Sequence, residues 1–193
     1  MRNRPRLVAE LLYSPVHFFS LLRLFCLRAR NNVLVTAHPT ARFMKEAWVD
    51  NFSGRSDTIH IGRGSIVRGS LTIFGHGGRI EIGDWCYVGE GSRIWSAARV
   101  RIGDRVLISH DVEIHDTVAH AISAQERHCQ YRELLEGGHQ RSLANVANAP
   151  VTIGDDVWIG FRSCIMRGVT IGEGALAVQV LDRHDADRGV LVD

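Results

Sequence analysis

A six-residue repeat constrains the fold of this chain more than any other feature of its sequence. Between Val151 and Ala175 isoleucine recurs at every sixth position, which matches neither the 3.6-residue period of a helix nor the alternation of a flat strand. These residues are Ile153, Ile159, Ile165 and Ile171. Glycine follows three of them, and a small or aliphatic residue lies four positions after each. The pattern favours a short strand and a tight corner in each repeat, with both marked side chains facing inward.

The same register occurs twice more upstream. It runs from Ile61 to Gly77, is interrupted by the stretch FGHGGR, and resumes from Ile82 to Val118 with two extra residues before Ile102. Three repeats make one triangular turn of a solenoid, so the chain is expected to be an all-β solenoid with about five turns of parallel β-helix. Aliphatic side chains then stack along the axis, and each turn covers the edge of the turn before it.

Two segments lie outside the repeat. Residues 1–58 lack a clean period and are predicted to form a helical and irregular N-terminal cap, which the β-helix follows over residues 59–193. The register is also lost over residues 116–150, and a long insertion inside a compact repeat is more often functional than not. Within this insertion Ser123 and Glu126 have capping-box spacing, and a Gly-Gly pair comes later, so the sequence predicts a helix there.

Composition excludes some classes of protein and favours others. The chain has 23 basic and 21 acidic residues and a net charge of +2, which gives no argument for a nucleic-acid partner. Its four cysteines are widely spaced and form no CxxC pair, so neither a zinc knuckle nor a disulfide framework is indicated. We interpret them as reduced thiols and expect a cytoplasmic protein.

The first thirty residues combine a basic start with an apolar body. Glu10, Pro15, His17 and Arg23 interrupt that body, so it lacks the run of roughly 18 to 20 apolar residues that a spanning helix needs. No small-residue cleavage site follows it. The favoured interpretation is a pair of short amphipathic helices that cap the open end of the stack. The alternative is a peripheral contact of residues 1–30 with the inner membrane through phenylalanine and leucine side chains.

Taken together, these motifs resemble a known family. The repeats, the Glu-Arg-His segment of the insertion and the Trp158-Ile159-Gly160 motif resemble the hexapeptide-repeat acyltransferases. Within that family the chain resembles the polysaccharide O-acetyltransferases of surface-glycan synthesis, which are relatives of the maltose and galactoside acetyltransferases. The resemblance covers about residues 47–175. It implies a left-handed parallel β-helix that assembles as a homotrimer with active sites between subunits.

The resemblance also implies a reaction and a catalytic residue. Relatives transfer an acetyl group from acetyl-CoA to a sugar hydroxyl with a histidine at the start of the loop. His120 stands at that position, with Ala119 and Ala121 in place of the usual polar residue and proline. An imidazole with the ordinary pKa of about 6.5 accepts the hydroxyl proton during attack and then protonates the departing thiolate. Backbone N–H groups stabilise the oxyanion. Asp116 is expected to orient the imidazole, and His115 is the reserve candidate.

The family binds acetyl-CoA in a groove between the coils of neighbouring subunits, along the final turns. Four residues match positions near that groove: Trp158, Gly160, Phe161 and Arg167. The resemblance fails after Ala175, where the glycines and the Thr-Lys pair of relatives are replaced by LAVQVLDRHDADRGVLVD. We therefore expect this atypical C-terminal sequence to weaken or abolish acetyl-CoA binding.

Two alternatives remain open. His110 and His115 have a spacing that resembles the γ-class carbonic anhydrases, which bind zinc between subunits through three histidines. The sequence offers no third histidine in a matching position, because the nearest candidate, His76, lies beside a disrupted repeat. We therefore expect no metal. The other alternative is a catalytically inactive β-helix that only assembles with partners.

Overall fold

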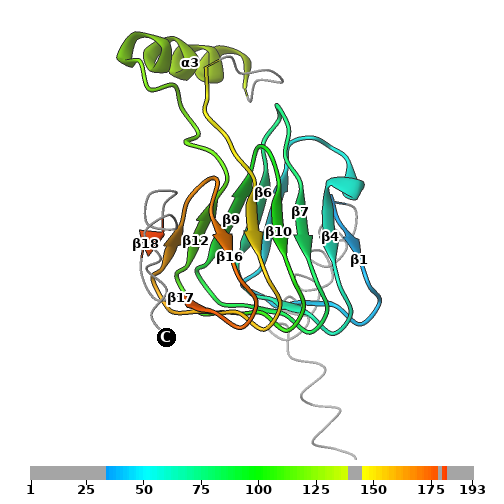
Figure 1. Ribbon diagram of the computed structural model, residues 1–193. Coiled ribbons are helices and arrows are strands. Elements are labelled where there is room, and N and C mark those ends of the chain that lie inside the picture. The colour runs from blue at the N-terminus through cyan, green and yellow to red at the C-terminus, as the bar shows by residue number, and fades with distance from the viewer. Residues whose placement is uncertain (1–33, 139–144, 178–179, 182–193) are drawn as a thin grey trace, which may run out of the picture.

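The chain winds into a parallel β-helix with three flat faces (Figure 1). In this computed structural model the structure describes residues 34–138, 145–177 and 180–181. The strands of the described residues form three six-stranded sheets, and all the pairings within them are parallel. Consecutive strands belong to different sheets, so each group of three strands makes one coil and the described chain makes six. The prediction of a six-residue solenoid is confirmed.

Each sheet takes one strand from every coil. The first sheet contains β1 (Thr36–Ala37), β4 (Ile59–Ile61), β7 (Ile80–Ile82), β10 (Val100–Ile102), β13 (Val151–Ile153) and β16 (Thr170–Ile171). The second contains β2 (Arg42–Phe43), β5 (Ile66–Val67), β8 (Tyr87–Val88), β11 (Leu107–Ile108), β14 (Trp158–Ile159) and β17 (Leu176–Ala177). The third contains β3 (Trp48–Asn51), β6 (Ser70–Ile73), β9 (Arg93–Ser96), β12 (Glu113–His115), β15 (Cys164–Ile165) and β18 (Val180–Leu181).

The core is a set of aliphatic columns that run along the axis. In the first sheet one column consists of Ile61, Ile82, Ile102, Ile153 and Ile171, which pair in register from coil to coil. Each of them is at most 3% exposed. Burying such a side chain stabilises the fold by about 1.5–3 kcal/mol. The isoleucines that define the repeat are therefore also the residues that hold the coils together.

Aspartates tie the coils together at the corner between the first and second sheets. Asp84 Oδ1 accepts a hydrogen bond from the Arg63 backbone N–H at 2.7 Å. Asp104 Oδ1 does the same for the N–H of Asp84 at 2.7 Å, and Asp155 Oδ1 for the N–H of Asp104 at 2.9 Å. A side chain at Gly83 would place its Cβ 2.3 Å from Asp104 Oδ1, so this close approach requires glycine. At each of these corners the recurrent Gly-Asp pair thus provides a carboxylate that accepts a hydrogen bond from a backbone N–H of the neighbouring coil.

The first coil corrects the predicted N-terminal boundary. The sequence analysis assigns residues 1–58 to an irregular cap, but β1, β2 and β3 lie in that segment and pair with the second coil. Ala37, Phe43 and Val49 continue the six-residue spacing there, and all three pack in or against the core. Alanine and phenylalanine take two of these inward positions, and no glycine directly follows Ala37, Phe43 or Val49, so the repeat is hard to recognise in the sequence. Residues 1–33, with the proposed amphipathic helices, lie outside the described residues.

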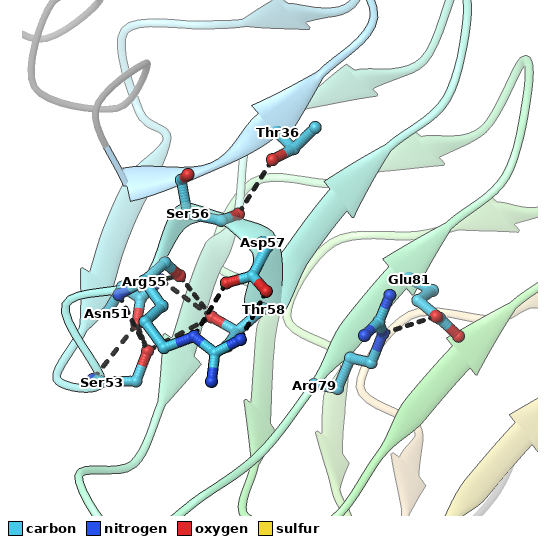
Figure 2. Close-up of polar contacts among 9 residues, drawn as sticks. All are labelled: Thr36, Asn51, Ser53, Arg55, Ser56, Asp57, Thr58, Arg79 and Glu81. Carbon is cyan, nitrogen blue, oxygen red and sulfur yellow. Dashed lines mark hydrogen bonds and ion pairs between the residues drawn. The ribbon is translucent and has the colours of Figure 1, made fainter.

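A polar network organises the turn between the first and second coils (Figure 2). The buried Asn51 side chain donates hydrogen bonds to the Leu34 carbonyl at 2.9 Å and the Arg55 carbonyl at 2.8 Å. It also donates to Thr58 Oγ1 at 3.0 Å. A short 3-10 helix, η1 (Ser56–Thr58), completes the turn. One buried amide therefore fixes the turn that also contains Phe52.

The insertion between β12 and β13 contains one helix. Helix α3 (Ala124–Gly137) follows Ser123 and stops at Gly138, so the predicted helix is confirmed. The capping box is not formed, because Ser123 makes no side-chain cap hydrogen bond. The helix stands off the coils in Figure 1, and it has no buried residue. Neither α3 nor any other helix in the described ranges has the length and apolar character needed to cross a membrane.

Candidate functional site

A pocket of about 320 Å³ lies where the insertion folds back over the first three coils. The third sheet contributes Asp50, Thr72 and Trp95. The corners that follow its strands contribute Phe52, Phe74 and His76. The insertion contributes Ala119, His120, Gln130 and Leu134. Residues far apart in the sequence thus meet because the loop after the fourth coil returns toward the N-terminal end of the stack.

The floor of the pocket is a column of side chains on the third sheet. Asp50, Thr72 and Trp95 are register partners on neighbouring strands, which lie about 4.8 Å apart, and His115 continues this column beyond the pocket. Trp95 stacks on His115 with a centroid distance of 4.7 Å and an angle of 4°. Phe74 meets Trp95 edge-on at 6.0 Å. These contacts hold the aromatic part of the floor in place.

The two ends of the insertion are paired at its base. Thr117 forms an isolated antiparallel bridge with Asn148. The N–H of Val118 donates to the Ala147 carbonyl at 3.1 Å. The segment that carries His120 therefore starts from a fixed base on the coil stack.

Asp116 lies at that base and is fully buried. Its carboxylate accepts hydrogen bonds from Ser96 Oγ at 2.6 Å, the N–H of Ala97 at 2.7 Å and the N–H of Ala98 at 3.0 Å. Burial raises the pKa of Asp116, and these hydrogen bonds oppose that rise. The carboxylate thus faces the preceding coil and accepts its donors there. Among the described residues no hydrogen bond joins it to His120, so its expected role in orienting the imidazole stays a prediction.

His120 lines the pocket and is exposed. The chain reaches it through Ala119, whose φ of 61° lies in the left-handed region that disfavours a side chain. Two short-range hydrogen bonds support this turn: the N–H of Ala119 donates to Thr117 Oγ1 at 3.1 Å, and the N–H of His120 donates to the Val118 carbonyl at 2.7 Å. The tight turn places an accessible imidazole at the pocket wall, as a general base requires.

His115, the reserve candidate, occupies a different environment. It is half-buried against Trp95, and its Nε2 lies 2.9 Å from Glu113 Oε2. Burial lowers the pKa of His115 and outweighs the opposing effect of Glu113. His115 is not among the residues that line the pocket. Its contacts therefore support Trp95 and give no access to a substrate in the pocket.

The structure brings together three of the four expected cofactor residues. Trp158 and Phe161 are 53% and 61% exposed, on β14 and the corner that follows it, and Gly160 lies buried between them. Arg167 lies at the next corner, between β15 and β16, where the insertion also leaves the stack. Within one chain the four residues therefore do not form a single surface. The C-terminal sequence expected to weaken acetyl-CoA binding lies almost entirely outside the described residues.

A family model matches one segment of the chain. The model described as the hexapeptide repeat of succinyl-transferase matches residues 150–176, the stretch with the clearest six-residue register. The chain therefore contains hexapeptide repeats in this segment and is similar to the hexapeptide-repeat acyltransferases.

Known proteins similar to this hexapeptide-repeat chain are acyltransferases. Galactoside O-acetyltransferase from Escherichia coli (strain K12) is 34% identical over 103 residues, 53% of this chain and 43% of that protein. The chain spans 40–44% of the length of the curated relatives it matches.

Solved structures agree on the fold. The polySia-specific acetyltransferase NeuO has a TM-score of 0.52 and 18% identity, over 74% of this chain and 54% of that one. A variant of AntD, an N-acyltransferase from Bacillus cereus crystallised with dTDP-4-amino-4,6-dideoxyglucose and coenzyme A, has a TM-score of 0.55. It is 16% identical, over 81% of this chain and 79% of that one. The predicted left-handed parallel β-helix is confirmed.

The histidines in the described part of this hexapeptide-repeat chain do not assemble a metal site. His110 stacks on Phe161 with a centroid distance of 5.5 Å, whereas His115 stacks on Trp95. Across the described ranges, no group of three or more histidine, cysteine, aspartate or glutamate side chains is arranged to hold a metal ion. The carbonic-anhydrase alternative therefore lacks a ligand set in this part of the chain.

Sequence reasoning missed most of the pocket. Asp50, Thr72 and Trp95 each follow a buried aliphatic residue directly, at the position where other repeats of the hexapeptide-repeat chain carry glycine. That substitution pattern is the signal that could have found them. Gln130 and Phe52 carry no comparable signal, because a loop helix and a coil corner place them.

Proposed function

We propose that this chain transfers an acetyl group from acetyl-CoA to a sugar hydroxyl in the synthesis of a surface polysaccharide, with His120 as general base. The observation that carries the proposal is the exposed imidazole on the wall of a pocket with aromatic and hydrogen-bonding side chains. A sugar ring offers both C–H faces and hydroxyl groups, and this lining suits both. The similarity to galactoside O-acetyltransferase supports the proposal.

The chemistry needs one proton carrier. His120 takes the proton of the acceptor hydroxyl as its oxygen attacks the thioester carbonyl of acetyl-CoA. The tetrahedral intermediate then collapses, the C–S bond breaks, and the imidazolium returns the proton to the thiolate of CoA. Phe52 and Phe74 offer apolar surface to the ring of the sugar, while Asp50 and Thr72 offer acceptors and a donor to its hydroxyl groups.

The co-substrate is proposed to lie along the last coils. Trp158 and Phe161 present exposed aromatic surface there, and CoA accompanies the sugar nucleotide in the AntD structure. Arg167 lies at another corner of the same coil, so a single groove that includes all three needs two subunits. A homotrimer with its active sites between subunits supplies that arrangement. We place the reaction in the cytoplasm, with residues 1–30 as a cap on the open end of the stack and a peripheral contact with the inner membrane as the alternative.

An assay of acetyl transfer tests the proposal. The protein is incubated with acetyl-CoA and a panel of galactosides, sialic acid polymers and amino sugars, and release of free CoA is measured. An O-acetyl ester is released from the product by mild alkali, whereas an N-acetyl amide survives, so the linkage identifies the reaction. Transfer to hydroxyl groups is expected. CoA release with no acetylated product, or an alkali-stable product only, would contradict the proposal.

The catalytic role of His120 has a matched control on the same insertion. His120→Ala should lower kcat by about 10²–10⁴-fold, the usual contribution of a positioned general base. His128→Ala removes an exposed histidine of α3 and should leave kcat unchanged. Equal activity of the two variants would remove His120 from the mechanism.

A further inference from the structure

Helix α3 binds the residue that directly follows His120. Arg127 Nη1 donates hydrogen bonds to the Ala121 carbonyl at 3.0 Å and to the Ile122 carbonyl at 2.9 Å. Gln130 Oε1 accepts a hydrogen bond from the N–H of Ala121 at 3.0 Å. Both main-chain polar groups of Ala121 are therefore bound by side chains of one helix.

The burial of Ala121 and the turn before His120 show that the main chain is held on both sides of the histidine. Ala121 is 1% exposed, although His120 before it and Ile122 after it are both exposed. On the other side of His120, the left-handed turn at Ala119 and the bond to the Val118 carbonyl set the path of the chain. His120 thus has a fixed main-chain anchor on each side, while its imidazole remains accessible.

We propose that Arg127 and Gln130 are positioning residues that set the place of the His120 imidazole in the pocket. The inference rests on the proposed function, since it assigns these residues a part in the same reaction. Gln130 also lines the pocket, so one side chain joins the pocket wall to the main chain of the catalytic segment. Through these bonds the position of α3 determines the position of the base.

The geometry of the two side chains explains why they suit this task. A guanidinium has several donors in a rigid plane, and here one nitrogen reaches two successive carbonyl oxygens. A lysine ammonium also carries several donors on one nitrogen, but its side chain is shorter and more flexible, so Arg127→Lys should retain only part of the function. Gln130→Glu keeps an oxygen acceptor for the N–H of Ala121, whereas Gln130→Leu removes it. A misplacement of about 1 Å at a reacting group costs about 10²-fold in rate.

The experiment compares these variants with controls on the same helix. Arg127→Ala and Gln130→Leu are tested against Arg132→Ala and Gln125→Leu, because Arg132 pairs with Glu136 and Gln125 is exposed. Two quantities are measured: kcat of acetyl transfer at saturating substrates, and hydrogen exchange of the Ala121 amide by NMR. The first two variants should lower kcat by about 10–100-fold with the KM for acetyl-CoA unchanged. Gln130→Leu should also lose protection of the Ala121 amide, and Gln130→Glu should keep both properties.

The outcomes separate this inference from the proposed function. Unchanged exchange at Ala121 in Gln130→Leu would overturn the inference, and so would lost protection with unchanged kcat. Wild-type protein that transfers no acetyl group would overturn the proposed function and the positioning role with it. Loss of kcat in Gln130→Leu with retention in Gln130→Glu and Gln125→Leu would support the inference.

Discussion

The coil stack and the insertion over residues 116–150 are built on opposite principles. In the stack every turn repeats, and the isoleucines at its inward positions are almost completely buried. In the insertion the helix α3 has no buried residue, and a few specific hydrogen bonds fix the segment around His120. The comparison indicates that the repeat supplies stability, while the insertion supplies the imidazole of His120 on a rigid support.

A pair of isoleucine substitutions tests this division most strongly. Ile108→Ala removes a fully buried side chain from the stack and should cost about 2–5 kcal/mol of unfolding free energy, since a cavity remains. Ile122→Ala removes a side chain of the insertion that is 78% exposed and should change stability by less than about 0.5 kcal/mol. Denaturant unfolding measures both. Similar costs at the two sites would show that the insertion carries stability too.

A substitution at the junction between the stack and the insertion should have the second-largest effect. Asp116→Asn puts an amide where three donors now meet a carboxylate, so we expect a loss of about 1–3 kcal/mol. Acetyl transfer should fall as well, because the base of the His120 segment loosens. Ser92→Ala is the control within the stack, since the buried Ser92 makes two hydrogen bonds but lies outside the insertion. Its unfolding free energy should fall while its activity per folded molecule is retained.

A pH series should show the smallest effect. The pKa of His115 lies below its ordinary value because burial disfavours the charged form, despite the nearby Glu113. The unfolded state therefore binds more protons than the folded state between the two pKa values, so this contribution to stability is lost as the pH falls through the histidine range. The stability of wild type relative to His115→Gln should rise from pH 5 to about pH 8. His128→Gln, on exposed α3, should show no such trend relative to wild type.

The regular repeat made most of the coil stack predictable from the sequence. The first coil and the path of the insertion could not be predicted, because neither follows that repeat clearly. The isoleucines of residues 151–175 alone indicate the coil, because a six-residue period fits no other regular structure. The first coil was missed because Ala37 and Phe43 satisfy the same inward positions without the isoleucine and glycine that mark them. The family resemblance indicated His120 from its local segment. Nothing in that segment shows that the loop returns over Asp50 and Phe52, since this path depends on tertiary contacts.

A crystal structure with an acceptor sugar and a non-reactive acetyl-CoA analogue tests the central claim most directly. The account predicts the sugar ring in the pocket beside Phe52 and Phe74, with one hydroxyl about 2.6–3.2 Å from an imidazole nitrogen of His120. A sugar bound elsewhere, with His120 facing only solvent, would contradict the account.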